Sequence, residues 1–426
     1  MFSTYRDVQC AALCAAILVY ALWGEPTPPA FGWPEILVGV LLTAAVGLRS
    51  FARAVTPVRG DAHPFWFRAG QFFLLYGLSV PLVGAVIAGA SPGNIVRDIV
   101  PFLFMLLPVF MVDTVRDRVR WHFIVTACVV VLGVIFAARV VAPLALASSG
   151  MDHAAQLGMN LSGQDPRRLA NAPSVLFAAM ALLGAAGWII TRRINANAMI
   201  SAAILSGVAL IPLAAMALVL QRASLGLLAL GLAFWIAIGI VKKPRRMVVP
   251  LLGLAVLCLM VWAPLADVVA GLAHKNVMVG ANMRWQEAAA VRDALHGIGA
   301  ILFGNGWGAT VQSPAVGDSI VTFTHNLGTT LWLKSGLIGV GLGLAYFGGL
   351  ALALIRFLPI HPILVVALGA PMVIDYLLYA SFKSLDFGLI LLLAALYSAR
   401  TAAVSPGGQP GNPVVFKTIP NNADFK

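Results

Sequence analysis

Long apolar blocks alternate with short polar segments along almost the whole chain. The blocks lack the period-two alternation of barrel strands, and a backbone in lipid has to satisfy its own hydrogen-bonding groups, so we expect helices. Most are long enough to cross the ~30 Å of hydrocarbon in a bilayer. The pattern predicts an all-α polytopic membrane protein. About twelve transmembrane helices are expected, at 8–23, 31–49, 69–89, 95–112, 121–148, 173–191, 199–220, 223–241, 247–272, 324–355, 360–380 and 385–400.

The composition agrees with this architecture. Of the 426 residues, 60% are hydrophobic and only 10% are charged, whereas charged residues make up about 25% of ordinary globular domains. A water-soluble enzyme, a disordered chain and a nucleic-acid-binding protein are excluded, and the lipid bilayer is the first expected partner. The four cysteines lie inside apolar blocks, where neither a disulfide framework nor a metal site is expected.

Basic residues predict which side of the bundle faces the cytoplasm. They recur at every second connection, for example at Arg116, Arg118 and Arg120, and cytoplasmic connections carry such an excess. We place this side and both termini in the cytoplasm and take the first span as an uncleaved anchor. The chain divides into a transmembrane domain at 1–403 and a Pro/Gly/Asn-rich tail at 404–426, which we expect to be a disordered cytoplasmic segment.

The opposite, periplasmic side has two long connections, at about 149–172 and 273–323. The second lies between helices nine and ten and has helical periodicity of its own around 282–298.

Several basic residues fall on the periplasmic side, against the usual bias. An ionisable group near membrane depth is costly and therefore usually functional, and the arginine fork suits phosphate oxygens. We expect these residues to bind a lipid-linked phosphate or diphosphate. The basic residues on this side are Arg97, Arg139, Arg167, Arg168, Arg222, Lys275, Arg284, Arg292, Lys334 and Lys383.

Local ion pairs are the alternative explanation for some of these residues. Arg97 is next to Asp98, and Arg284 is three residues before Glu287 on a predicted helix. Arg222 differs, because no acidic residue lies within forty positions on either side. A helix beginning near Ser224 would add backbone N–H groups that favour an anion at the same place.

A histidine stands where the long periplasmic loop re-enters the membrane, in Thr322-Phe323-Thr324-His325-Asn326-Leu327. A neutral imidazole can accept a proton from a hydroxyl near pH 7, and Asn326 is placed to orient the ring or a sugar hydroxyl. The alternative is an interfacial histidine that caps a helix. The outer loops contain no Asp-x-Asp, His-x-x-His or Cys/His cluster, so we expect neither a metal nor another cofactor.

Five short motifs follow one another in a recognisable order: Gln221-Arg222-Ala223-Ser224, Arg284-Trp285, Leu302-Phe303-Gly304-Asn305-Gly306-Trp307-Gly308, His325-Asn326 and Gly336-Leu337-Ile338-Gly339. This order resembles the O-antigen ligase and polymerase superfamily of bacterial envelope glycan assembly. The superfamily includes lipopolysaccharide O-antigen ligases, Wzy-type polymerases and protein O-oligosaccharyltransferases. The motifs cover roughly 220–345, and the twelve-span layout extends the resemblance to nearly the whole chain.

The resemblance implies a C-type, metal-independent, inverting glycosyltransferase in the inner membrane of a Gram-negative bacterium. Such a ligase transfers O-antigen glycan from undecaprenyl diphosphate to lipid A–core on the periplasmic face. By the resemblance, His325 activates the acceptor hydroxyl, Arg222 lies at the donor diphosphate, and Arg284 is the loop arginine. Arg139 and Arg292 are added as substrate-binding candidates from their sidedness alone. Members of the superfamily often carry Ser-Arg-Gly where this chain has Gln221-Arg222-Ala223.

Two other functions stay open on the sequence. A Wzy-type polymerase of O-antigen or exopolysaccharide would use the same chemistry. A transporter of lipid-linked anionic glycans would also need outward arginines, together with a mid-span charge for coupling, for which Asp375 is the candidate. The glycines at 304, 306 and 308 predict a tight turn rather than a nucleotide-binding loop, because no Lys-Ser pair follows them directly, as it does in a Walker motif.

Overall fold

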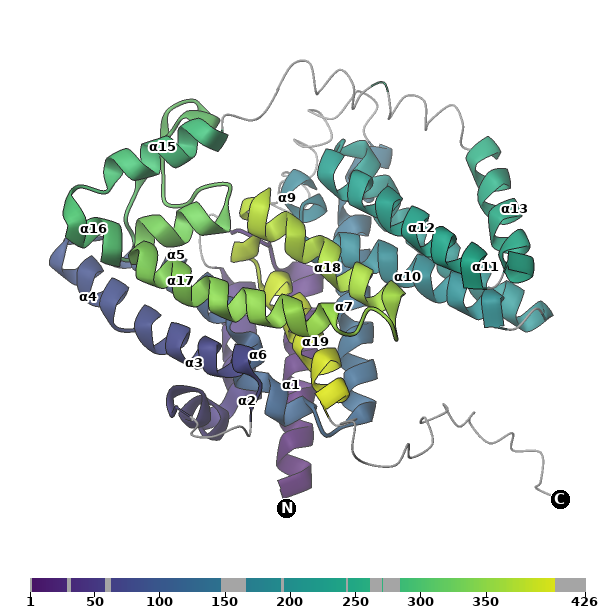
Figure 1. Cartoon of the computed structure of the whole chain (residues 1–426), viewed down its shortest axis with the longest axis horizontal. Coiled ribbons are helices and arrows are strands. Elements are labelled where there is room, and N and C mark those ends of the chain that lie inside the picture. Colours follow the sequence, from purple (N-terminus) through teal and green to yellow (C-terminus); the bar gives the residue numbers. More distant parts are fainter. Residues whose placement is uncertain are drawn as a thin grey trace.

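The computed structural model describes residues 2–28, 32–57, 63–146, 166–192, 195–242, 244–260, 270 and 284–402, nearly all of them helical (Figure 1). The predicted tail at 404–426 and the start of the long loop at 273–283 lie outside the described residues. The longer helices are α1 (Phe2–Trp23), α2 (Trp33–Val55), α3 (Phe65–Gly77), α5 (Pro92–Met105), α7 (Val119–Leu146), α10 (Pro173–Arg192), α11 (Ala196–Leu218), α12 (Arg222–Lys242), α13 (Pro244–Met260), α15 (Arg284–Ala294), α17 (Leu327–Ile355), α18 (Pro362–Leu377) and α19 (Leu385–Ala402). The shorter elements are α4 (Val80–Ile87), α6 (Leu107–Val115), α9 (Pro166–Ala170), α16 (Gly297–Phe303), β1 (Val311–Ser313), η1 (Pro314–Val316), β2 (Ser319–Val321) and η2 (Ala380–Lys383).

The prediction of an all-α polytopic membrane protein is confirmed. Among the described residues, nine helical segments are long and apolar enough to cross a bilayer, and α18 and the apolar part of α19 are shorter. A helix lies on each of the twelve predicted ranges, although α13 ends at Met260 and the rest of the ninth range lies outside the described residues. Two of the predicted spans are each built from two consecutive helices, α3 with α4 and α5 with α6. Pro81 and Pro108 stand at the start of the second helix in each pair, where a proline has no N–H to donate to the preceding turn.

The C-terminal helix α19 forms the centre of the molecule. Residues 389–396 are all fully buried, and the helix packs against α5, α6, α7, α10, α17 and α18. A helix that is apolar on every side is expected to be surrounded on every side. These six helices surround α19, and large apolar side chains are exposed on the outside of the bundle, as a lipid-facing surface requires.

The long loop between α13 and α17 carries the predicted helix, α15, followed by α16 and a small hairpin. In the hairpin β1 pairs with β2 in antiparallel register, with Val311 opposite Val321. The hairpin was not predicted. Val291, Leu295, Val311 and Leu333 form a second, small apolar core. This core fastens α15 and the hairpin onto the first turns of α17.

The tight turn predicted after α16 is confirmed, since Gly304, Gly306 and Gly308 all have φ near +80°. A Cβ on Gly306 would lie 2.3 Å from the backbone nitrogen of Ala85. The turn therefore packs directly onto α4, which only glycine allows. Gly336 has φ +66° inside α17 and bends that helix where it passes Leu302.

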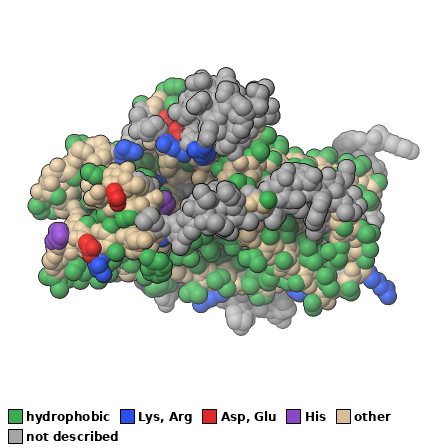
Figure 2. Space-filling view, turned by 90° about the horizontal axis from the view of Figure 1, so that it is seen from above, with side chains coloured by type: hydrophobic (Ala, Val, Ile, Leu, Met, Phe, Trp, Pro, Cys, Tyr) green, Lys and Arg blue, Asp and Glu red, His purple; other side chains and the backbone are tan. Residues whose placement is uncertain are grey.

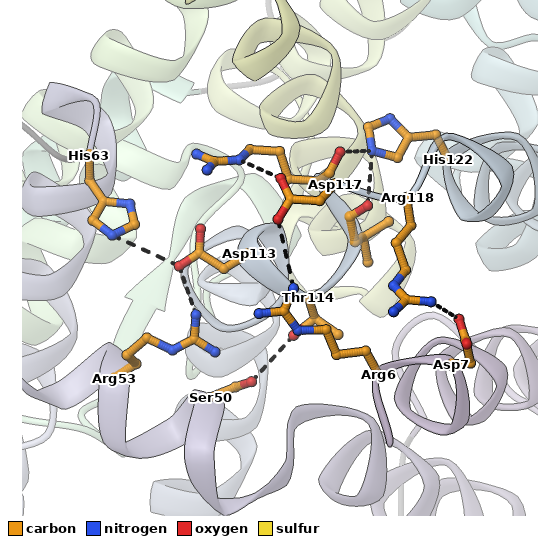
Figure 3. A network of polar contacts seen from close by, with 12 residues as sticks. Arg6, Asp7, Ser50, Arg53, His63, Asp113, Thr114, Asp117, Arg118 and His122 are labelled. Carbon is orange, nitrogen blue, oxygen red and sulfur yellow. Dashed lines mark hydrogen bonds and ion pairs between the residues drawn. The ribbon is translucent and has the colours of Figure 1, made fainter. Parts of the chain in front are cut away.

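A network of charged and polar side chains lies at the opposite end of the bundle from α15 (Figures 1 and 3). Asp113 accepts a hydrogen bond from Arg53 at 3.0 Å, and Asp7 pairs with Arg118 and Trp121. These contacts join the ends of α1, α2, α6 and α7. Arg6, Arg53 and Arg118, for which a cytoplasmic position is predicted, lie in this network.

Candidate functional site

The imidazole of His325 lies against a buried carboxylate. Its Nδ1 is 3.1 Å from Oε1 of Glu287, and its backbone N–H donates to Oε2 of the same side chain at 2.9 Å. The Glu287 side chain is only 2% exposed, whereas that of His325 is 31% exposed. Because the carboxylate accepts from Nδ1, the proton of a neutral ring is held there, and Nε2 keeps the lone pair that can accept another proton.

Glu287 is held from a third direction by Ser313, whose hydroxyl donates to Oε1 at 2.6 Å. Ser313 is fully buried and ends strand β1. The hairpin that sequence analysis did not predict therefore positions the carboxylate. Since His325 and Glu287 are separated by 38 residues and Ser313 lies in an unpredicted strand, no local pattern indicated this arrangement.

The pKa of Glu287 lies below its ordinary value. Burial raises the pKa of this carboxyl, but the hydrogen bonds from His325 and Ser313 lower it by more. The carboxylate is therefore ionised at neutral pH. It complements the positive charge that His325 acquires when it takes up a proton.

Asn326 caps α17. Its side-chain oxygen accepts from the backbone N–H groups of Gly328 and Thr329, at 2.7 and 3.3 Å, which is the usual work of an N-cap. Thr324 is fully buried and bonds to Thr330. The cap and the threonine contacts fix the backbone on both sides of His325. Asn326 therefore supports the histidine through the backbone, because its amide oxygen already accepts the hydrogen bonds of the cap.

Arg284 begins α15, one turn before Glu287, so the two residues share a face of the helix. Its Nε is buried and has no hydrogen-bond partner among the described residues. The alternative of an Arg284–Glu287 ion pair is not found, because the carboxylate is taken by His325 and Ser313. Arg284 thus begins the helix that carries Glu287 and keeps an Nε–H without a partner among the described residues, and its substrate-binding role stays a prediction.

Asp98 does not form an ion pair with Arg97, which was the alternative explanation for Arg97 from the sequence. Its carboxylate accepts from the Lys334 ammonium at 2.6 Å and from the backbone N–H of Gly308 at 2.6 Å. Lys334 is fully buried and also donates to the carbonyl of Ala309. The pair ties α5, α17 and the glycine turn together next to the site.

Arg222 is the first residue of α12, which confirms a helix N-terminus at this position. The preceding Gln221 is buried and donates to the Asn171 side chain at 2.9 Å, and Leu220 has φ +52°. The backbone is thus sharply turned just before α12, at a residue other than glycine. The hydrogen bonds of His325 are formed with Glu287 on α15 and not with this segment. The role of Arg222 at a diphosphate stays a prediction.

Arg139 and Arg292 are engaged elsewhere. Arg139 donates to the carbonyl oxygens of Ala21 and Gly24 at 2.8 and 3.0 Å and so caps the end of α1. Arg292 forms an exposed pair with its neighbour Asp293, at 2.9 Å. Neither contact brings these two arginines to His325, and their substrate-binding roles stay predictions from sidedness alone.

Lys and Arg side chains gather beside a hollow on the face that carries α15, with a histidine at its edge (Figure 2). Within the described ranges, no three His, Cys, Asp or Glu side chains come together as a metal site would require. A scan against protein-family models and a search of curated proteins both find no match to the chain. The site is therefore interpreted from its own geometry.

Proposed function

We propose that this multi-pass membrane protein is a glycosyltransferase of the O-antigen ligase type. It moves a glycan from undecaprenyl diphosphate to lipid A–core at the periplasmic face of a bacterial inner membrane. The observation that carries the proposal is the His325–Glu287 pair, a half-exposed imidazole held on a buried carboxylate at 3.1 Å. A histidine oriented in this way is the usual arrangement for removing a proton from a hydroxyl.

The chemistry follows from the positions of these groups. The acceptor sugar hydroxyl attacks the anomeric carbon of the donor, and His325 Nε2 takes the hydroxyl proton as the new C–O bond forms. The bond from the anomeric carbon to the diphosphate oxygen breaks, and the diphosphate leaves with the electron pair. Arginine charge stabilises the leaving group, a contact whose loss commonly costs ~10²–10³ in rate. Attack opposite to the leaving group inverts the anomeric centre.

The glycolipids of a deletion strain test this function and separate it from polymerisation. Loss of a ligase should leave long glycan on the lipid carrier and bare lipid A–core. Loss of a Wzy-type polymerase would instead leave core capped with a single repeat. Unchanged glycolipids would contradict both forms of the proposal.

A further inference from the structure

Four exposed basic side chains gather where α10, α12 and α13 meet. Helix α13 lies at one edge of the molecule and packs against both α10 and α12 (Figure 1). The Arg246 guanidinium, at the start of α13, donates to the carbonyl oxygen of Thr191 at 3.0 Å. This bond holds the start of α13 against the end of α10 and brings the charges of the two helices together. The four residues form the α10–α13 basic cluster: Arg192, Lys242, Arg245 and Arg246.

The α10–α13 basic cluster has no acidic counterpart in its own part of the chain. The sequence contains no Asp or Glu between Asp165 and Asp267. None of the four residues forms an ion pair with any residue that the structure describes. The positive charge of the cluster is therefore not neutralised from within the described chain.

The network at the ends of α1, α2, α6 and α7 provides a comparison, because its basic residues are also predicted to be cytoplasmic. Arg53 pairs there with Asp113 at 3.0 Å, and Arg118 pairs with Asp7 (Figure 3). A preference for the cytoplasmic side accounts for both groups of basic residues. It does not account for the carboxylate partners of one group and the unneutralised charge of the other.

The helices themselves do not require the charges of the cluster. Arg245 and Arg246 lie in the first turn of α13, where the helix dipole disfavours positive charge. The guanidinium of Arg192 lies over the ring of Trp188, 4.5 Å from the ring centroid. This contact orients the planar fork, while the exposed side chain keeps its N–H groups accessible to a ligand.

Exposed apolar side chains lie beside the cluster and place it at the edge of the hydrocarbon. Val241, next to Lys242, is 83% exposed, and Trp188, Ile240 and Val248 are also exposed. In a helix that crosses a bilayer, such side chains face lipid. The cluster therefore lies where hydrocarbon gives way to headgroups. The abundant anion at that depth is the phosphate of a lipid.

We propose that the α10–α13 basic cluster binds the headgroup of an anionic phospholipid. Arginine forks can hydrogen-bond to two phosphate oxygens at once, and clusters of four or more cations beside a membrane helix favour anionic lipids. The cluster shares no element with the His325–Glu287 pair. This inference therefore does not depend on the proposed function.

Direct binding to the full-length protein in detergent tests the site. Phosphatidylglycerol, cardiolipin, phosphatidylethanolamine, a polyglutamate peptide and a short oligonucleotide are titrated separately by native mass spectrometry. The variant is Lys242→Gln/Arg245→Gln, because both side chains are exposed and neither contributes a hydrogen bond to the described fold. Arg6→Gln/Arg116→Gln is the matched control, since it removes the same charge from two arginines that pair with Asp117.

We expect phosphatidylglycerol and cardiolipin to bind the wild type at least tenfold more tightly than phosphatidylethanolamine. Lys242→Gln/Arg245→Gln should weaken binding of the two anionic lipids by about tenfold, and the control variant should bind them as the wild type does. Equal affinity for the three lipids, or the same loss in both double variants, would overturn the site. Tighter binding of the peptide or the oligonucleotide than of phosphatidylglycerol would assign the cluster to a water-soluble partner and would also overturn it.

Discussion

At the scale of single residues, His325 and Glu287 have different roles in the site. The partly exposed imidazole can meet an incoming hydroxyl, while the buried carboxylate fixes which ring nitrogen carries the proton. Ser313 and the backbone of His325 complete the contacts of the carboxylate. A carboxylate buried to this extent is stable only because it receives these hydrogen bonds.

Glu287→Gln tests this dependence through the effect of pH on stability. The folded pKa of Glu287 is lowered, so its stabilising contribution is complete above its ordinary pKa of about 4.5 and is lost as pH falls through the lowered value. The variant should melt below the wild type at pH 7, and the two melting temperatures should converge below pH 4.5. Asp293→Asn, on the exposed side of α15, is the control. A difference that stays constant from pH 7 to pH 3 would contradict the pairing.

Arg284 and Arg292 lie on the same helix but have different surroundings. Arg284→Lys removes the fork with the unpartnered Nε and should raise KM for the lipid donor by about tenfold. Arg292→Lys keeps a charge in an exposed pair and should change KM much less. Steady-state kinetics with donor titration measure both variants, and a larger effect at Arg292 would reverse the assignment.

At the scale of elements, the sequence predicted the helices whose positions depend on long apolar patterns. The spans could be located because every turn of a lipid-embedded helix has to be apolar. The glycine turn was predictable because of its three closely spaced glycines, and α15 because of its periodicity. Strands of three residues leave no such pattern, and the partnership of His325 with Glu287 joins positions that only tertiary folding brings together.

The glycine turn gives a test at this scale. Gly306→Ala places a Cβ against the backbone of Ala85 in addition to a positive φ, which alone costs roughly 1–2 kcal/mol. Gly317→Ala has a similar φ of +68° but open space around it, so it reports the strain alone. Thermal unfolding should show a clearly greater loss for Gly306→Ala. Equal losses would mean that contact with α4 contributes nothing.

At the scale of the whole molecule, the buried pair of Asp98 and Lys334 joins the bundle to the loop between α13 and α17. Removing one partner of a buried ion pair costs about 3–5 kcal/mol, whereas replacing both by apolar groups is often nearly neutral. Lys334→Met should therefore lower stability strongly, and Asp98→Leu/Lys334→Met should recover much of the loss. Chemical denaturation in detergent measures both, and a double variant less stable than the single one would contradict this.

The most direct test of the central claim is glycan transfer by the purified protein in detergent, with undecaprenyl-diphosphate glycan and lipid A–core as substrates. The account predicts transfer by the wild type without a sealed membrane, which a transporter would not show. His325→Ala should reduce the rate by ~10²–10⁴ while the protein still inserts and folds. His296→Ala, at an exposed histidine in the same loop, should keep the wild-type rate. Normal transfer by His325→Ala would contradict the account.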